Sequence, residues 1–330
     1  MLDVVALGEL LIDFAPRGTD GEGNPLLAAQ PGGAPGNFLA ALSRYGARTA
    51  MLAKVGEDAF GRLLLDALEK AGVGTQGVRR DPEAFTTLAF VTLDSRGDRS
   101  FSFARKPGAD TRLSFQELDL GLIDQARVFH FGSLSLTDEP VRSCTHQAVE
   151  YARGKGKLVT FDPNLRPALW TCQEQARQEI LWGIGRADVV KLSGEEAAFL
   201  WGCAPQEGAQ QLLRQFPRVQ LALLTLGAQG CLVQNRRAAC RMGTPPVRPV
   251  DTTGAGDIFG GAAVARLLEL GTPPEALSEE ELRQVAQFAT VAASLSTQRP
   301  GGIPSVPSRR EVLAQIQQGG QPPAAEKGEC

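Results

Sequence analysis

Two kinds of hydrophobic pattern alternate along most of the chain. Short, mostly apolar runs, typical of strands buried in a parallel sheet, occupy residues 4–7, 126–131, 158–161, 189–192 and 221–226. Longer helical stretches occupy residues 38–45, 59–72, 141–153, 174–185, 195–202, 258–270 and 278–295. The repetition of strand and helix predicts an α/β fold with a doubly wound, mostly parallel sheet flanked by helices. Ligands of such sheets gather beyond the carboxyl ends of the strands.

Two segments depart from this alternation. Residues 86–103 change polarity at every second position on both sides of a polar turn at 94–98, which predicts a β-hairpin. Residues 15–30 are polar and rich in turn residues. Together they predict a small β-sheet across one edge of the main sheet, which we interpret as a lid made of about residues 14–31 and 86–108. Its open edge and outer face predict a homodimer formed through the lid.

The length of the chain bears on its domain organisation. With 330 residues, 43% of them hydrophobic, the chain has ample apolar surface for a core, and residues 1–318 are predicted to form a single domain. Residues 319–330 are rich in Gly, Pro and Glu and are predicted to be a disordered tail.

Composition and charge disfavour several classes of function. The 34 Lys and Arg residues are interspersed with 37 Asp and Glu residues, so we expect no nucleic acid partner. Six cysteines without a C-x-x-C pair, and only two histidines, disfavour a zinc enzyme and a His-dependent hydrolase. No apolar run reaches transmembrane length and the sequence opens without a secretory leader, which predicts a cytoplasmic protein with no membrane partner.

The most informative stretch is Asp-Thr-Thr-Gly-Ala-Gly-Asp at 251–257, directly before a predicted helix. Backbone amides at the start of a helix attract anions, and the small residues Gly254, Ala255 and Gly256 allow a phosphate to approach closely. Asp257 would repel that phosphate unless its role is to take a proton from the attacking group. The stretch therefore predicts an anion hole with Asp257 as general base. The alternative is that Asp257 only caps the helix.

Fingerprints of two other nucleotide-binding classes are absent from the sequence. Residues 56–62 place two glycines five apart, but Arg62 and Leu63 stand where a P-loop needs Lys and Ser or Thr. The Gly-x-Gly-x-x-Gly pattern of dinucleotide-binding folds is missing after the first strand and again at 254–260. A P-loop enzyme and a nicotinamide dehydrogenase are therefore disfavoured.

Polar residues near the N-terminus are candidates for ligand binding. Asp13 ends the second apolar segment, where a carboxylate can bind a hydroxyl group or cap a turn. Gly32, Gly33 and Asn37 precede a helix. They can let the backbone and the amide approach a polyhydroxylated ligand, or they can form an ordinary loop and cap.

Three further candidates lie later in the chain. Asp162 and Asn164 follow a predicted strand and suit either a ligand contact or the capping of a turn. Arg105 comes just after the hairpin and is either a surface charge or a clamp on a substrate.

These motifs resemble those of a known family. The heptapeptide at 251–257 resembles the second signature of the phosphofructokinase B, or ribokinase-like, sugar kinases, and Gly-Gly-x-x-x-Asn at 32–37 has the shape of their first signature. Within that family, the runs at 105–110, 162–166 and 225–230 are similar to those of fructokinases, although Ala104 stands in place of a tyrosine. The resemblance covers residues 3–316 and implies the ribokinase-like fold.

The resemblance implies an ATP-dependent kinase that phosphorylates the primary 6-hydroxyl of D-fructose, with Asp257 as base, the amides of 254–257 as anion hole, and Mg²⁺ and K⁺ as cofactors. It implies sugar contacts from Asp13, Gly32, Gly33, Asn37, Arg105, Asp162 and Asn164. It implies ATP contacts from Lys191, Ser193, Glu196, Thr225, Gly227 and Gly230. Glu196 would also hold Mg²⁺ through water. Asp251 and Thr253 would line the K⁺ site, beside a loop at 298–307 that closes over adenine.

Other functions remain open from the sequence. 2-Keto-3-deoxygluconate kinase shares almost all of this scaffold, and ribokinase and nucleoside kinases share its phosphate half. The stretches 104–110 and 164–166 favour fructokinase among these. A non-catalytic sugar or nucleotide sensor is the alternative of another class, and the intact Asp257 argues against it.

Overall fold

The computed structural model describes residues 1–93 and 99–319. Within these residues, nine strands form the main sheet in the order β13-β12-β11-β10-β9-β8-β1-β4-β5. The strands from β11 to β5 are parallel, and β12 and β13 add antiparallel pairs at one edge. The bounds are β1 Val4–Leu7, β4 Thr49–Gly56, β5 Val73–Asp81, β8 Val128–Gly132, β9 Leu158–Asp162, β10 Val189–Ser193, β11 Leu221–Thr225, β12 Cys231–Gln234 and β13 Ala239–Met242.

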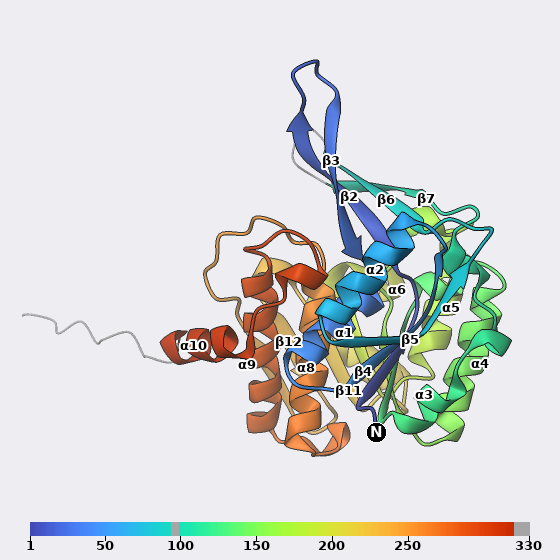
Figure 1. The fold of residues 1–330 in the computed structure, drawn as a ribbon. Coiled ribbons are helices and arrows are strands. Elements are labelled where there is room, and N and C mark those ends of the chain that lie inside the picture. The colour runs from blue at the N-terminus through green and yellow to red at the C-terminus, as the bar shows by residue number, and fades with distance from the viewer. Residues whose placement is uncertain (94–98, 320–330) are drawn as a thin grey trace, which may run out of the picture.

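Helices cover both faces of this sheet (Figure 1). Successive residues of a strand point to opposite faces, so Val4 and Ala6 of β1 join one hydrophobic cluster while Val5 and Leu7 join the other. The first cluster packs against α1 Ala34–Arg44, α2 Ala59–Lys70, α8 Ala255–Leu270, α9 Glu279–Ser296 and α10 Arg309–Gly319. The second packs against α3 Leu120–Gln125, α4 Val141–Gly154, α5 Gln173–Ile184, α6 Gly194–Trp201 and α7 Gly208–Gln215.

A second, smaller sheet rises from the main body (Figure 1). Its described strands are β2 Leu11–Thr19, β3 Pro25–Gly32, β6 Thr87–Leu93 and β7 Arg99–Ala104, in the order β3-β2-β6-β7. The pairs β2–β3 and β6–β7 are antiparallel, and β2 and β6 join them in parallel. The two segments that broke the strand–helix alternation thus form one small sheet, as predicted. The predicted turn at 94–98, and all of the predicted tail except Gly319, lie outside the described residues.

The α/β fold class predicted from the sequence is confirmed, but some element boundaries differ. Helix α1 begins at Ala34 rather than 38, because Pro35 suits the first turn of a helix. Helix α8 begins at Ala255 rather than 258, so Asp257 lies inside its first turn. The sequence analysis did not predict β4, β5, α3, α7 or α10.

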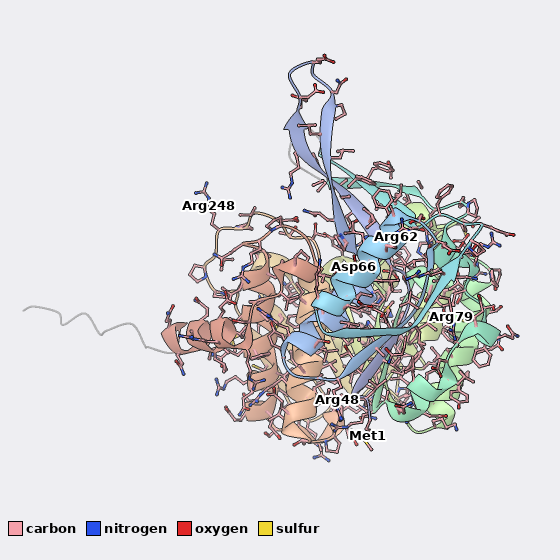
Figure 2. All side chains as sticks on the ribbon, in the orientation of Figure 1. Met1, Arg48, Arg62, Asp66, Arg79 and Arg248 are labelled. Carbon is pink, nitrogen blue, oxygen red and sulfur yellow. The ribbon has the colours of Figure 1, made fainter. Side chains whose placement is uncertain are left out.

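Several charged side chains lie at the surface of the molecule. Arg62 and Asp66 of α2 and Arg248 of the loop before α8 are exposed and extend outward (Figure 2). Among the described residues, no helix is both long and apolar enough to span a membrane.

Candidate active site

Two cavities meet at the loop that carries the heptapeptide. The first, about 250 Å³, has carboxylate, amide and guanidinium groups in its wall, and we call it the polar cavity. The second, about 470 Å³, is lined by uncharged residues, among them Pro, Ala, Val and Phe as well as Thr and Gly, and we call it the apolar cavity. Thr252 and Gly256 line both of them. The loop 251–257 is therefore the wall that the two cavities share.

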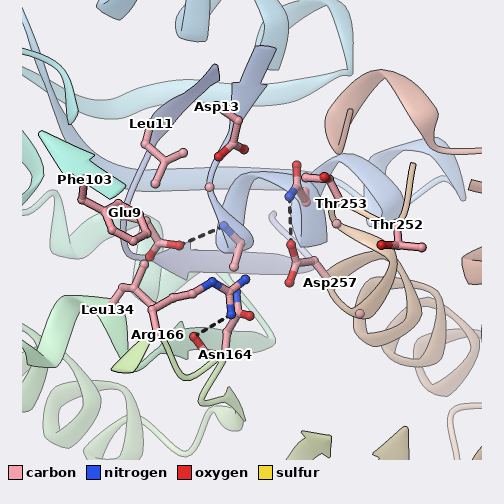
Figure 3. Close-up of a pocket in the computed structure, with 15 residues that line it drawn as sticks. Glu9, Leu11, Asp13, Phe103, Leu134, Asn164, Arg166, Thr252, Thr253 and Asp257 are labelled. Carbon is pink, nitrogen blue, oxygen red and sulfur yellow. Dashed lines mark hydrogen bonds between the residues drawn. The ribbon is translucent and has the colours of Figure 1, made fainter. Parts of the chain in front are cut away.

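Asp257 lies at this wall, in the first turn of α8, with 7% of its surface exposed. Its Oδ2 accepts a hydrogen bond of 2.8 Å from the side-chain amide of Asn37 in α1 (Figure 3). Burial raises the pKa of Asp257, while the Asn37 hydrogen bond and the charges of Lys191 and Arg166 oppose this effect. A buried carboxylate with a raised pKa, held at the edge of a polar cavity, is suited to accept a proton.

The start of α8 does not use Asp257 as a cap. Gly254 occupies the N-cap position with a left-handed φ of 75°, and no side-chain cap hydrogen bond is present in this fully described helix. The amides of the first turn, which include those of Gly256 and Asp257, have no acceptor within the helix. They lie at the positive end of the helix dipole, so the loop is suited to hold an anion.

Asp251 holds the loop in this shape. Its Oδ1 accepts a hydrogen bond of 2.9 Å from the amide of Thr253, and its Oδ2 accepts one of 2.9 Å from the amide of Gly301. The amides of Val250 and Asp251 both donate to the carbonyl of Thr297. The loop 251–257 is thereby tied to the segment 297–302, which follows α9.

Most residues predicted to bind sugar surround the polar cavity. Asp13, Gly33, Asn37 and Asn164 line it (Figure 3). Gly33 has a left-handed φ of 112°, and a Cβ on it would lie 2.5 Å from the carbonyl oxygen of Glu9, so glycine is required there. Gly32 does not line the cavity, although a Cβ on it would collide with the carboxylate of Asp13.

Arg105 lines a third cavity, which shares Phe103 with the polar cavity. It does not line the polar cavity and is 4% exposed. Its Nε donates to Asp110 at 2.8 Å, its Nη1 to Thr137 at 2.7 Å and its Nη2 to the carbonyl of Leu134 at 2.9 Å. The guanidinium thus joins the end of β7 to the main body, and a contact with sugar stays a prediction.

Asp162 and Lys191 form an ion pair below the cavities. They lie on the neighbouring strands β9 and β10, with Lys191 Nζ 3.1 Å from Asp162 Oδ2. Neither residue lines the polar or the apolar cavity. The predicted sugar contact of Asp162 and the predicted ATP contact of Lys191 therefore stay predictions.

The residues predicted to bind ATP fall into two groups. Thr225, Gly227 and Gly230 line the apolar cavity. Ser193 and Glu196 form a capping box at the start of α6, in which Glu196 Oε2 accepts from the amide of Ser193 at 2.7 Å. Glu196 Oε1 accepts from the amide of Leu165 at 2.8 Å. The carboxylate is thus fixed beside the loop that follows β9.

The residues of the polar cavity that the sequence analysis missed include Glu9, Phe103 and Arg166. Glu9 is buried, and its Oε1 accepts a hydrogen bond of 2.9 Å from the amide of Ala34. Burial raises its pKa to about 7, against the effects of the two backbone amides and Arg105. Its position beyond the carboxyl end of β1 was a signal that could have identified it. Arg166 likewise follows β9, two residues after Asn164.

Metal-binding residues are sparse. In the part of the chain that the structure describes, no group of three or more His, Cys, Asp or Glu side chains could hold a metal ion. A divalent cation here would need ligands from a nucleotide and from water, as Mg²⁺ commonly has.

Comparison with known proteins decides the family. The pattern of the pfkB family of carbohydrate kinases matches residues 1–309. The chain belongs to this family. It is 42% identical over 316 residues to Fructokinase-1 of Zea mays, an alignment that covers 95% of this chain and 97% of that protein.

Solved structures of pfkB-like proteins share the fold throughout. A fructokinase from Xylella fastidiosa with bound ATP has a TM-score of 0.88 and 32% identity, covering 97% of this chain and 100% of that one. A fructokinase from Vibrio cholerae O395 with fructose, ADP and calcium ion has a TM-score of 0.83 and 32% identity, covering 96% and 99%. This pfkB kinase therefore has the ribokinase-like architecture over essentially its whole length.

Proposed function

We propose that the protein is an ATP-dependent fructokinase that transfers the γ-phosphoryl group of ATP to the primary 6-hydroxyl of D-fructose. The observation that carries the proposal is the meeting of a polar and an apolar cavity at the loop 251–257, with Asp257 buried at the junction. A polyol fits the polar cavity and a nucleotide the apolar one. The plant relative and the two bacterial neighbours are fructokinases by name, which supports fructose as the sugar.

The mechanism follows from the residues at the junction. Asp257 accepts the proton of the 6-hydroxyl, and the hydroxyl oxygen attacks the γ-phosphorus while ADP leaves. Asn37 holds one carboxylate oxygen of Asp257, which leaves the other available for the sugar. The amides of Gly254, Ala255, Gly256 and Asp257 stabilise the negative charge on the transferring group.

Sugar binding is assigned to the wall of the polar cavity. Asp13, Asn37 and Asn164 are suited to hydrogen bonds with hydroxyl groups, and Gly33 gives the backbone close access. The charged side chains of the wall are three carboxyl groups, Glu9, Asp13 and Asp257, and one guanidinium, Arg166. Such a wall favours a neutral sugar over a sugar acid, because a carboxylate ligand would meet more repulsion than attraction.

A second candidate, 2-keto-3-deoxygluconate kinase, rests on Arg166. Its guanidinium belongs to the same wall and could pair with the carboxylate of a sugar acid. The excess of carboxyl groups makes this candidate the weaker one.

Nucleotide and cations are assigned to the remaining residues. Thr225, Gly227 and Gly230 line the apolar cavity, where ATP would bind. Mg²⁺ would be held by the phosphates and by water, with Glu196 as an outer carboxylate, and would neutralise phosphate charge. K⁺ would lie near Asp251 and Thr253, where the Asp251 carboxylate accepts the amides of Thr253 and Gly301 and joins the heptapeptide loop to the segment 297–302.

The small sheet is proposed to act as a lid and as a dimer interface. Phe103 of β7 lines the polar cavity, so this sheet forms part of the sugar site. Leu26 and Leu27 of β3 are 47% and 42% exposed on its edge strand, where a second copy would bury them. A single sedimenting species of monomer mass at micromolar concentration would contradict the dimer.

A cytoplasmic location, where ATP and hexoses are present, is also part of the proposed function.

The experiment that tests the function is sugar-dependent release of ADP by the purified protein with Mg-ATP. Fructose, 2-keto-3-deoxygluconate, ribose and adenosine are compared at matched concentrations. A preference for fructose is expected. A preference for 2-keto-3-deoxygluconate would support the second candidate, which rests on Arg166. No release of ADP with any of the four compounds would favour a non-catalytic sensor.

A further inference from the structure

A buried ion pair lies directly beneath the shared wall of the two cavities. Lys191 Nζ is 3.1 Å from Asp162 Oδ2 and 3.2 Å from Oδ1, and the two side chains are 9% and 8% exposed. In the parallel register of β9 and β10, Val190 is opposite Phe161, which brings the next residues of both strands side by side. The strand register therefore fixes this pair.

The ammonium of Lys191 lies against the anion-binding loop. A Cβ built on Gly256 would be 3.0 Å from Nζ, and Gly256 lines both cavities. Because glycine has no side chain, the ammonium can approach the backbone of the loop closely at this residue. Asp162, Glu196 and Asp257 raise the pKa of Lys191, although burial acts in the opposite direction. A permanent positive charge is thus held below the loop.

Asp162 is engaged by protein groups rather than directed into the sugar site. It does not line the polar cavity. Besides Lys191, its Oδ1 accepts a hydrogen bond of 3.2 Å from the amide of Asn164. Burial raises the pKa of Asp162 to about 7, against the opposing charge of Lys191. A carboxylate so placed is more useful as an anchor for Lys191 than as a ligand for a hydroxyl.

We propose that Asp162 is a positioning residue, which holds the Lys191 ammonium beneath Gly256 so that it stabilises the charge of the transferring phosphoryl group. The inference rests on the proposed kinase function and deepens it. The Lys191 side chain is long enough to shift its ammonium toward an arriving phosphate. Without Asp162, the ammonium would be left with Glu196 and Asp257, the other carboxylates that raise its pKa, and its position would no longer be fixed. Asp162 therefore keeps the cation available to the phosphate and away from the base.

The test is the variant Asp162→Asn, assayed with the sugar that the wild-type enzyme accepts. We expect kcat to fall on the order of ten- to a hundredfold, because the cation is misplaced, while the KM for sugar is unchanged. A rise in the sugar KM without a fall in kcat would overturn the proposal and make Asp162 a sugar ligand. Asp188→Asn is the matched control: Asp188 is also a buried carboxylate in an ion pair, but its partner is Arg218 and not the lysine beside Gly256.

A double-mutant cycle separates the positioning role from a general structural one. Lys191→Met should lower kcat on the order of a hundredfold, as loss of a charge-stabilising group does. In that background Asp162→Asn should cause no further loss of kcat, and the doubly neutral pair should fold and bind sugar normally by calorimetry. Additive losses, or weaker sugar binding by the double variant, would overturn the proposal. Wild-type protein that turns over no sugar at all would instead refute the proposed function.

Discussion

The substitution Asp257→Asn tests the general base with little change of shape. In the structure Asp257 Oδ2 accepts a 2.8 Å hydrogen bond from the Asn37 amide. An asparagine at 257 that offers its carbonyl oxygen to that amide turns its own NH₂ toward the sugar, and in either orientation an amide cannot take up the proton. The 6-hydroxyl then faces a donor instead of a proton acceptor. General bases typically contribute 10²–10⁴ in rate, so we expect kcat to fall by this factor, roughly 3 to 5 kcal/mol of transition-state stabilisation.

The stability of the Asp257→Asn variant should not fall together with its kcat. Burial raises the pKa of Asp257, so the folded state holds the proton more tightly than the unfolded state does. The stability linked to this group is complete below the pKa of the unfolded chain and is lost as the pH rises through the folded pKa. At neutral pH the ionised carboxylate of Asp257 therefore does not stabilise the folded state. We expect the variant to melt at the wild-type temperature or above it.

Three measurements on one preparation decide whether Asp257 acts as a general base or only caps helix α8. Coupled release of ADP gives kcat, calorimetry gives the affinity for sugar, and thermal melting gives the stability. Ser278→Ala removes a true helix cap, that of α9, far from the cavities, and should lower the melting temperature without touching kcat. If Asp257→Asn instead melts early and keeps a kcat within about tenfold of wild type, our account of the base is wrong.

Three further predictions concern residues around Asp257. Gly33→Ala should cost about 1–3 kcal/mol of unfolding free energy and raise the sugar KM, because its left-handed φ and the Glu9 carbonyl leave no room for a Cβ; unchanged urea titrations would contradict this. Burial raises the pKa of Glu9 from 4.5 to about 7, so the folded state holds its proton more tightly than the unfolded state. As the pH rises from 4.5 to 7, the free energy of unfolding of the wild type should therefore fall by roughly 3 kcal/mol more than that of Glu9→Gln. Parallel pH profiles of the two proteins would refute it. Gly302→Ala would push against the Asn37 side chain that holds Asp257, and kcat should fall on the order of tenfold. Gly271→Ala, at a left-handed glycine in open space, is its control and should leave kcat unchanged.

The extent to which the sequence predicts the fold depends on burial. Strands β1, β8, β9, β10 and β11 are mostly apolar because both of their faces are covered, and all five are predicted. The edge strand β5 has partly exposed residues such as Gln76 and Arg80, so it carries no such run. Strand β4 is buried along its whole length, and its apolar run was a signal that the sequence analysis did not use.

Site residues could be predicted from the sequence only where they belong to a local motif. Residues inside a local motif, such as Asp257, Gly33 and Asn37, are predicted because the motif needs them at fixed spacing, and the structure brings them to one cavity. The bond between Asn37 and Asp257 joins residues 220 positions apart, and no local pattern encodes it. The same holds for the pairing of Asp162 with Lys191, which depends on strand register. Such contacts arise only when the elements pack.

The division of the two cavities between parts of the chain has a consequence for specificity. Outside the loop 252–257, the described wall of the polar cavity comes from residues 9–37, 103, 134 and 164–166. Outside the same loop, the wall of the apolar cavity comes from residues 225–249, Phe259 and residues 290–297. Changes in the first set can therefore alter the sugar while the nucleotide keeps its contacts. The shared loop has no such freedom, because its amides, its glycines and Asp257 must serve both ligands at once. This explains in physical terms why the loop carries the most distinctive motif of the sequence, whereas Glu9 and Arg166, which lie outside that motif, had only their positions after β1 and β9 as a signal.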